Sequence, residues 1–329
     1  MSRVAVMGAG AWGTAFAMIM ADAGNPVTLW ARRAAVAEGI NSVRRNPDYL
    51  SDVPLPTGLT AVTDPQQALT DAELVVLAIP AQQLRANLLD WRLPNDSLLI
   101  SLAKGVENET LLTMSQVVTD IGVDAERVLA VSGPNLAGEI GQRQPAAAVV
   151  AAHSTGTADR VAAACRTGYF RPYTSVDVVG CEIGGATKNA IALAVGMGQG
   201  LGMGANSLAS LITRGLAETS RLGEALGADP HTFAGLAGMG DLVATCMSPL
   251  SRNRTFGELL GRGHDVAQAR ALSRGVTEGV RSAASIQALA ERHDVDMPIV
   301  GHVVDVLAGR QTPRDAIGTM MARQTRPER

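Results

Sequence analysis

Two lysines are the residues of this sequence best suited to acid–base chemistry. Among its 28 lysines and arginines, Lys104 and Lys188 are the only lysines. A guanidinium stays protonated in a protein, whereas an ammonium can lose its proton and act as an acid or a base. Because the sequence uses arginine at its other basic positions, the two lysines indicate positions that need a removable proton. The alternative is that both are ordinary surface lysines.

The surroundings of both lysines favour a functional site. Lys188 is the only charged residue between Glu182 and Arg214, so a helix there would bury its ammonium among apolar side chains. Burial lowers the pKa of an ammonium, and a second nearby cation lowers it further, toward the working range of a general acid. Lys104 follows an apolar run at residues 98–102, and ligands bind at the carboxyl ends of parallel strands. We therefore expect the two lysines to meet across a cleft between two domains.

A glycine-rich turn, Gly8-Ala9-Gly10-Ala11-Trp12-Gly13, lies near the N-terminus between an apolar run and a helical stretch. In a dinucleotide-binding unit, the first glycine permits a tight turn and the second lets the backbone approach the pyrophosphate. The third glycine allows the helix to pack closely on the strand. The positive end of the helix then faces the phosphates. The turn predicts a bound dinucleotide; a glycine-rich turn that binds no ligand is the alternative.

The residues at the end of the second strand select between NAD(H) and NADP(H). A carboxylate there binds the ribose 2′-hydroxyl of NAD, whereas arginine suits the 2′-phosphate of NADP. This sequence has Arg32 and Arg33 at that point and no carboxylate. The pattern favours NADP(H), with NAD(H) as the second choice, unless the two arginines belong to a solvated basic loop.

The elements that must position these residues change in kind along the chain. The first half contains near-continuous apolar runs, typical of parallel strands covered on both faces, at residues 4–7, 27–30, 74–79, 98–102, 128–131 and 147–151. Helical stretches alternate with these runs, for example at residues 13–23 and 109–121. Beyond residue 179 we expect only helices, at residues 181–197, 207–226, 256–260, 281–293 and 299–307. The pattern predicts an α/β protein, with a doubly wound Rossmann-type domain at 1–179 and an all-α substrate and catalytic domain at 180–329.

Composition limits the partners of such a protein. A formal net charge of −3 and 3% aromatic residues give no reason to expect nucleic acid or an acidic membrane surface. The stretch 189–213 is apolar enough to resemble a membrane span, but its glycines and polar residues favour a buried helical region over membrane insertion. Three cysteines and five histidines lack metal-ligand spacing, so we expect no metal. Free cysteines, and a first strand at residue 4 with no signal peptide before it, predict a cytoplasmic protein.

An ordered set of short motifs resembles the bacterial NAD(P)-dependent sn-glycerol-3-phosphate dehydrogenases, from Val4 to about Leu307. Besides the glycine turn, the motifs are Ala103-Lys104-Gly105, Ser132-Gly133-Pro134-Asn135, Gly185-Ala186-Thr187-Lys188-Asn189, Gly238-Met239-Gly240-Asp241-Leu242, Ser251-Arg252-Asn253-Arg254 and Glu278-Gly279. The resemblance implies reversible hydride transfer between NAD(P)H and glycerone phosphate, which gives sn-glycerol 3-phosphate for phospholipid synthesis. It also implies a homodimer.

The resemblance implies roles for individual residues. Lys188 would donate the proton to the ketone oxygen, and Lys104 and Asn189 would orient or polarise the substrate. Asp241 would hold the hydrogen-bond network of the catalytic lysine, with Thr245 nearby. The implied substrate-binding positions are Lys104, Gly133, Asn135, Lys188, Asp241, Ser251, Arg252 and Asn253. The implied cofactor-binding positions are Gly8, Gly10, Ala11, Trp12, Gly13, Arg32, Arg33, Lys104, Ala137, Arg252, Val276 and Glu278.

Two positions depart from the family pattern, and some assignments keep an alternative. Many members carry serine or threonine where this chain has Asn135, and serine is frequent where it has Ala11. Asp241 could instead cap a helix, and Arg252 could belong to a solvated face. Two other functions also fit the motifs: a β-hydroxyacid or 6-phosphogluconate-type dehydrogenase with a catalytic lysine, and a non-catalytic NADPH sensor. A sensor, however, has no use for an acid–base lysine in an apolar helix.

Overall fold

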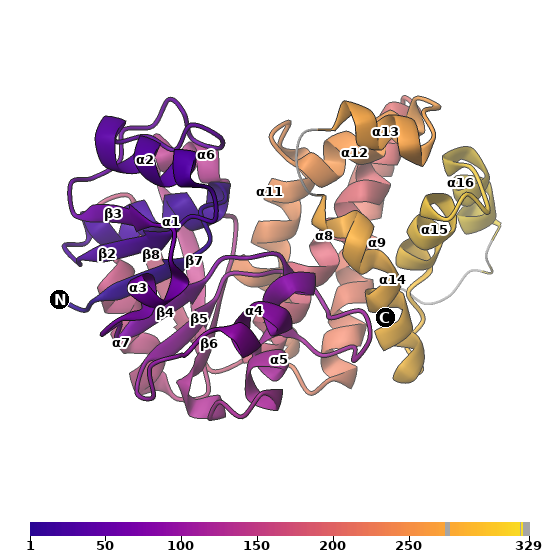
Figure 1. Cartoon of the computed structure of the whole chain (residues 1–329). Helices are drawn as coiled ribbons and strands as arrows, with labels where there is room; N and C mark the ends of the chain where they lie inside the picture. Colours follow the sequence, from indigo (N-terminus) through magenta and orange to yellow (C-terminus); the bar gives the residue numbers. More distant parts are fainter. Residues whose placement is uncertain (274–276, 323, 325–329) are drawn as a thin grey trace.

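The computed structural model describes residues 1–273, 277–322 and 324. An eight-stranded sheet forms the N-terminal half, and the helices of the C-terminal half lie beside it (Figure 1). The strands are ordered β3-β2-β1-β4-β5-β6-β7-β8. Their bounds are β1 Val4–Met7, β2 Val27–Trp30, β3 Leu59–Val62, β4 Leu74–Leu77, β5 Leu98–Ser101, β6 Val128–Ser132, β7 Ala146–Ala152 and β8 Phe170–Ser175. This is the predicted doubly wound architecture, with a topological switch between β1 and β4.

Helices cover both faces of the sheet, and alternate residues of each central strand enter two different cores. Val6 of β1 packs in the same cluster as Phe16 of helix α1, whereas Met7 packs with Leu84 and Val117 on the opposite face. The helical elements of this half are α1 Ala11–Asp22, α2 Ala34–Val43, α3 Pro65–Leu69, η1 Ala81–Gln83, α4 Leu84–Asp90, α5 Met114–Asp120, η2 Ala125–Arg127, α6 Ala137–Gly141 and α7 Thr155–Cys165.

Burial explains which strands can be predicted from the sequence. β1, β4, β5 and β6 are buried at every position, so their sequences are continuous apolar runs. The six predicted strands are confirmed, with ends that differ by at most two residues. β3 and β8 are not predicted. β3 buries only alternate residues, and β8 lies at the edge of the sheet with the polar sequence Arg171-Pro172-Tyr173-Thr174.

Two expectations about this half are wrong. β7 pairs with β6 in antiparallel orientation, although parallel strands were expected throughout. The connection at residues 133–145 contains only the five-residue helix α6, which does not carry the chain back along the sheet as a full crossover helix does. The helix expected at 109–121 starts only at Met114, because Leu111 has a φ of 61° and Val106 forms a β-bridge with Thr113.

In the described residues after Ser175, every regular element is helical, as predicted. The five predicted helices are found as α8 Val178–Gly200, α9 Ala205–Ala225, α12 Arg252–Gly261, α14 Glu278–Arg292 and α15 Pro298–Leu307. The elements α10 Pro230–Ala234, η3 Leu236–Gly240, α11 Asp241–Met247, α13 Val266–Leu272 and α16 Pro313–Met321 are additional. The predicted division between residues 179 and 180 falls in the first turn of α8, which contacts both the sheet and the other helices, and it stays a prediction.

Helix α8 is the centre of the C-terminal half (Figure 1). A β-carbon on Gly196 of α8 would collide with the carbonyl oxygen of Arg254, and one on Gly257 of α12 would collide with that of Leu193. The backbones of α8 and α12 are therefore in direct contact. Within the described residues, α8 is also the one helix long and apolar enough to cross a membrane, and 89% of its apolar window is buried inside the protein. The apolar stretch 189–213 thus spans the end of α8 and the start of α9.

Glu218 joins two helices of this half. In α9, its carboxylate accepts hydrogen bonds from the N–H groups of Ile299 at 2.8 Å and Val300 at 3.3 Å, in the first turn of α15. Glu218 is 2% exposed, and burial raises its pKa to about 7, although the two N–H groups and Arg221 oppose the shift. The folded protein therefore holds this proton more tightly than the unfolded chain. The contribution of Glu218 to stability is greatest at low pH and falls as pH rises from about 4.5 to about 7.

Replacing Glu218 with glutamine should remove this pH-dependent loss. Between pH 5 and pH 8, the variant should gain roughly 2–3 kcal/mol of unfolding free energy relative to the wild type. Denaturant unfolding at both pH values measures the change. Glu224→Gln, an exposed position on the same helix, is the control and should show no pH-dependent difference. A Glu218→Gln effect of equal size at both pH values would contradict the prediction.

Candidate active site

Four side chains from distant parts of the chain meet in one buried cluster. Lys188, in α8, donates hydrogen bonds to Oδ1 of Asp241 and, at 2.8 Å, to Oγ1 of Thr245. Lys104, just after β5, donates to Oδ2 of the same carboxylate at 2.6 Å and to the carbonyl oxygen of Gly133 at 3.2 Å. Asp241 is 1% exposed and Lys188 is 9% exposed. The structure thus brings both lysines of the sequence to a single carboxylate.

The surroundings of Lys188 lower its proton affinity. Burial lowers the pKa of Lys188 to about 8; the charge of Lys104 acts in the same direction, and the carboxylate of Asp241 opposes it. An ammonium with such a pKa is protonated at neutral pH and releases its proton more readily than an exposed lysine. The cluster can therefore hold a proton at Nζ of Lys188 and transfer it.

Glycines in α8 let the other parts of the cluster approach. A β-carbon on Gly184 would collide with the carbonyl oxygen of Ala237, and one on Gly185 would lie 3.4 Å from Cγ of Lys104. Ala237 belongs to η3, a π-helical turn that leads directly into Asp241, the first residue of α11. Such turns are frequent at functional sites. The glycines and the π-helical turn together place the Asp241 carboxylate between the two lysines.

Asn189 takes part in a second buried network beside Lys188. Its Oδ1 accepts a hydrogen bond from Nδ2 of Asn253 at 2.8 Å, and Oδ1 of Asn253 accepts one from the N–H of Gly279 at 2.9 Å. Asn189, Asn253 and Gly279 come from α8, α12 and α14. This network fixes the start of α12 next to the lysine cluster.

The start of α12 has the expected cap. The Oγ of Ser251 accepts a hydrogen bond from the N–H of Arg254 at 3.3 Å, so Ser251 is the N-cap that the sequence suggests. Arg252 is the first helical residue and is exposed, whereas Arg254 is buried and forms an ion pair with Glu258 at 3.5 Å. The guanidinium of Arg252 is therefore available to an anion at the positive end of α12.

Two other predicted binding residues have buried polar atoms that lack a hydrogen-bond partner among the described residues. These atoms are Nδ2 and Oδ1 of Asn135 and Oε2 of Glu278. Burial also raises the pKa of Glu278, although Arg281 and Arg252 oppose the shift. Buried polar atoms nearly always have a partner, so these atoms mark places where a ligand or water would bond.

The glycine-rich turn has the geometry that a dinucleotide needs. Gly8 has a φ of +130°, and a β-carbon there would lie 2.5 Å from the carbonyl oxygen of Ala78. A β-carbon on Gly13 would collide with the carbonyl oxygen of Gly8, so the helix and the turn are in contact. At Gly10, in contrast, nothing lies within 4 Å of such a carbon. The turn is tight where it packs and open where a pyrophosphate would approach, so the residues present fit the cofactor.

The remaining cofactor positions lie at element ends. Ala11 is the first residue of α1 and Ala137 the first of α6. The half-buried ring of Trp12 packs edge-on against Phe16, and its Nε1 has no partner among the described residues. Val276 lies outside the described residues.

The two arginines after β2 are exposed, and one of them has a partner that the sequence did not suggest. Arg33, the N-cap residue of α2, forms an ion pair with Asp48, in the loop that follows the helix. That loop is tied to the glycine turn by Asn46, whose Nδ2 donates to the carbonyl oxygen of Ala9 at 3.0 Å and to Thr14 at 2.8 Å. Neither Asp48 nor Asn46 belongs to a recognisable motif, so only the folded chain reveals them.

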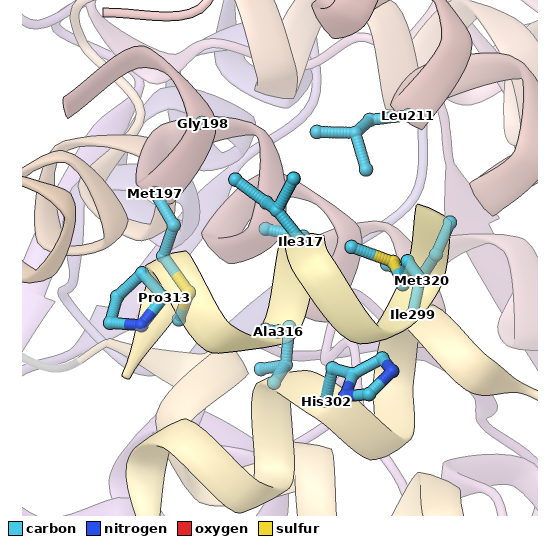
Figure 2. A pocket seen from close by; sticks show the side chains of 11 residues that line it. Met197, Gly198, Leu211, Ile299, His302, Pro313, Ala316, Ile317 and Met320 are labelled. Carbon is cyan, nitrogen blue, oxygen red and sulfur yellow. The ribbon is translucent and has the colours of Figure 1, made fainter. Parts of the chain in front are cut away.

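A separate cavity lies among the helices of the C-terminal half. Figure 2 shows it between α16 and the neighbouring helices, lined by Met197, Leu211, Ile299, His302, Ile317 and Met320, among others. Its volume is about 20 Å³, which is room for about one water molecule. None of the predicted site residues lines it, and it is a small packing defect of the helical half.

The described residues contain no group of three or more His, Cys, Asp or Glu side chains that could hold a metal ion. The three cysteines, Cys165, Cys181 and Cys246, are buried and free. Burial raises the pKa of each thiol to about 12, so the thiolate form, which is the reactive one, is scarce.

Comparison with known proteins gives a consistent result over nearly the whole chain. Residues 3–158 match the family described as NAD-dependent glycerol-3-phosphate dehydrogenase N-terminus, and residues 177–318 match its C-terminus. A relative from Streptomyces griseus, named glycerol-3-phosphate dehydrogenase (NAD(P)+), is 56% identical over 330 residues, which cover 99% of this chain and 98% of the relative. A relative of the same name from Nocardia farcinica is 53% identical over 337 residues and is covered completely.

The comparison of folds supports the same family. A crystal structure of glycerol-3-phosphate dehydrogenase from Coxiella burnetii superposes with a TM-score of 0.93 at 31% identity, over 98% of this chain and 99% of that one. Sequence motifs, fold and relatives agree along both halves of the chain. The chain belongs to the NAD-dependent glycerol-3-phosphate dehydrogenase family.

Proposed function

We propose that this protein is an oxidoreductase that reversibly reduces glycerone phosphate to sn-glycerol 3-phosphate with NAD(P)H. One observation carries the mechanism: the buried ammonium of Lys188 shares the carboxylate of Asp241 with Lys104. The family to which the chain belongs and the names of its relatives support the reaction. The same cluster argues against a non-catalytic NADPH sensor, because a sensor does not need a proton donor.

In this mechanism, Lys188 handles the proton. When bound, the nicotinamide would supply the hydride to the carbonyl carbon. Negative charge that develops on the ketone oxygen is stabilised by the Lys188 ammonium, which then donates its proton from Nζ. Asp241 and Thr245 hold Nζ in place through the hydrogen bonds described above. In the oxidation direction, the neutral Lys188 amine takes the proton back from the hydroxyl group.

Lys104 and Asn189 orient the substrate in this proposal. The Lys104 ammonium, anchored on Asp241 and the Gly133 carbonyl group, adds positive charge beside the reacting oxygen. The unpaired amide of Asn135 and the backbone of Gly133 complete the substrate side of the site. The residues that hold the cofactor are those of the glycine turn together with Arg32, Arg33, Ala137 and Glu278, and Arg252 reaches both cofactor and substrate.

The substrate phosphate binds at the start of α12, to Arg252, Asn253 and the Ser251 cap. A guanidinium and a helix N-terminus both favour a dianionic phosphate. Holding the phosphate there fixes the carbonyl group relative to Lys188, so binding energy far from the reacting carbon becomes correct orientation.

Replacing Arg252 with alanine should therefore raise the KM for glycerone phosphate by about tenfold to a hundredfold, because a charged hydrogen-bonding partner is lost. Steady-state kinetics at saturating cofactor give this value. Arg262→Ala is the matched control, since Arg262 is exposed and lies at the other end of the same helix. An unchanged KM in Arg252→Ala would overturn the phosphate assignment.

One assay tests the proposed function as a whole. Oxidation of NADH and NADPH is followed side by side, with glycerone phosphate and with 3-oxo acids as substrates. We expect glycerone phosphate to be reduced and the 3-oxo acids to be inert, because Arg252 suits a phosphate. Reduction of a 3-oxo acid alone would favour a β-hydroxyacid dehydrogenase. Arg32 and Arg33 favour NADP(H) as the better cofactor, with NAD(H) also used.

The cellular setting follows from the same proposal. The product, sn-glycerol 3-phosphate, would feed glycerophospholipid synthesis in the cytoplasm, with the enzyme as a homodimer and without stable membrane insertion or nucleic-acid partners. The burial of α8 inside the protein supports the absence of membrane insertion. Sedimentation of the purified protein gives the oligomeric state directly.

A further inference from the structure

The loop after α2 places a carboxylate beside a strand end whose own sequence has none. The chain after β2 reads Ala31-Arg32-Arg33, which lacks the acidic residue that usually binds the ribose 2′-hydroxyl of NAD. In the folded chain, Asp48 forms an ion pair with Arg33. A carboxylate and a guanidinium thus stand side by side at the end of the second strand, although 15 residues separate them in the chain.

The loop that carries Asp48 is held firmly. The N–H of Asp48 donates to Oδ1 of Asn46 at 3.1 Å, and Asn46 is fully buried against the glycine turn. Pro47 packs on α2, where a β-carbon on Gly39 would lie 3.0 Å from it. Leu50 is 7% exposed and belongs to the core. The Asp48 carboxylate therefore does not have to be ordered when a ligand arrives, which reduces the entropic cost of using it.

The pair itself remains accessible. The side chains of Arg33 and Asp48 are 59% and 31% exposed. An exposed ion pair contributes little to the stability of the fold, so either member can exchange its partner for a ligand group at small cost. The guanidinium offers donors to a 2′-phosphate, and the carboxylate offers an acceptor to a 2′-hydroxyl.

We propose that Arg33 and Asp48 form a two-way recognition site for the adenosine ribose, and that Asp48 is the residue that allows NAD(H) to bind. The Asp48 carboxylate accepts a hydrogen bond from the 2′-hydroxyl of NAD(H). With NADP(H), Arg33 instead leaves Asp48 and binds the 2′-phosphate. In the second case the carboxylate opposes the phosphate by charge repulsion, so Asp48 also weakens NADP(H) binding. This inference rests on the proposed use of NAD(P), and it revises the expectation that the sequence provides no carboxylate for NAD.

Two single substitutions should move the two cofactor affinities in opposite directions. Asp48→Asn should weaken NADH about fivefold to tenfold and tighten NADPH about twofold to fivefold. Arg33→Gln should weaken NADPH about tenfold or more and leave NADH within about twofold. Isothermal titration calorimetry of the full-length protein with NADH and with NADPH gives the four dissociation constants without turnover.

Asp305→Asn is the matched control, because Asp305 is a partly exposed aspartate paired with Arg310 on α15, at the opposite end of the molecule from α2 (Figure 1). It should change neither constant. Melting temperatures of all variants show whether each one is folded. If Asp48→Asn weakens both cofactors by the same factor, or tightens NADH, the inference is wrong and Asp48 merely supports the loop.

The titrations separate this inference from the proposed reaction. If glycerone phosphate is not reduced but the two variants still shift NADH and NADPH in opposite directions, the reaction fails and the recognition site stands. If glycerone phosphate is reduced but the shifts are equal, the reaction stands and the recognition site fails. If the wild type binds neither cofactor, both fail.

Discussion

Replacing Lys188 with alanine should lower the turnover of glycerone phosphate by about 10²- to 10⁴-fold, the range typical of a lost general acid. The dissociation constant for NADPH should stay unchanged, because the glycine turn and the arginines after β2 lie elsewhere in the fold. Asp241 keeps Lys104 as its partner in this variant, so no carboxylate is left buried without a counter-charge. Single-turnover kinetics and calorimetric titration measure the two quantities.

The wild-type pH profile tests the same role. Reduction uses the protonated form of Lys188, so its kcat should fall as pH rises through about 8. Oxidation of sn-glycerol 3-phosphate uses the neutral amine, so its kcat should rise over the same interval. Near-normal turnover in Lys188→Ala, or a reduction rate that increases through pH 8, would refute the assignment.

Replacing Asp241 with asparagine should be the most damaging change to both activity and stability. It removes the only carboxylate that pairs with Lys104 and Lys188 in the part of the chain that the structure describes. Loss of one partner from a buried ion pair costs about 3–5 kcal/mol, and two ammonium groups would then face each other. The unfolding free energy in urea and kcat should both fall. The falling limb of the reduction profile should move to lower pH, because Asp241 raises the pKa of Lys188.

Asp241 is not the cap of α11, because the N-cap residue is Gly240 and the Asp241 carboxylate accepts hydrogen bonds from the two lysines instead. An aspartate that does cap a helix tolerates asparagine, which caps helices as well as aspartate does. Asp265→Asn is the matched control, because Asp265 is an exposed N-cap that accepts from the N–H of Gln268. We expect that control to be neutral in both assays. An equally neutral Asp241→Asn would remove Asp241 from the mechanism.

Features with a local physical cause could be predicted from the sequence. β1 and β4 are buried on both faces and read as unbroken apolar runs. The glycine turn needs glycine for backbone reasons, and Lys188 stands out because no other charged residue lies between Glu182 and Arg214. Each of these signals lies in one continuous stretch of the sequence.

Features that depend on distant contacts could not be predicted. β8 is a strand because β7 pairs with it, not because its own polar sequence favours one. Asp48 becomes part of the candidate site only because Asn46 ties its loop to the glycine turn. The short α5 results from the turn at Leu111, whose positive φ no sequence pattern indicates. In each case the cause is either a contact with another part of the chain or a strained backbone conformation.

The contact between the backbones of α8 and α12 has a consequence for substrate choice. α8 carries Lys188 and the start of α12 carries Arg252, so the separation of the two helices fixes the distance between the proposed proton donor and the proposed phosphate site. Side-chain packing can expand or shrink by a methylene group, but a glycine pressed on a carbonyl group cannot come closer. Contacts between main-chain atoms therefore set the distance between the two proposed sites. A phosphorylated ketone one carbon longer would have to fit a distance that main-chain contacts fix and that side-chain repacking does not adjust.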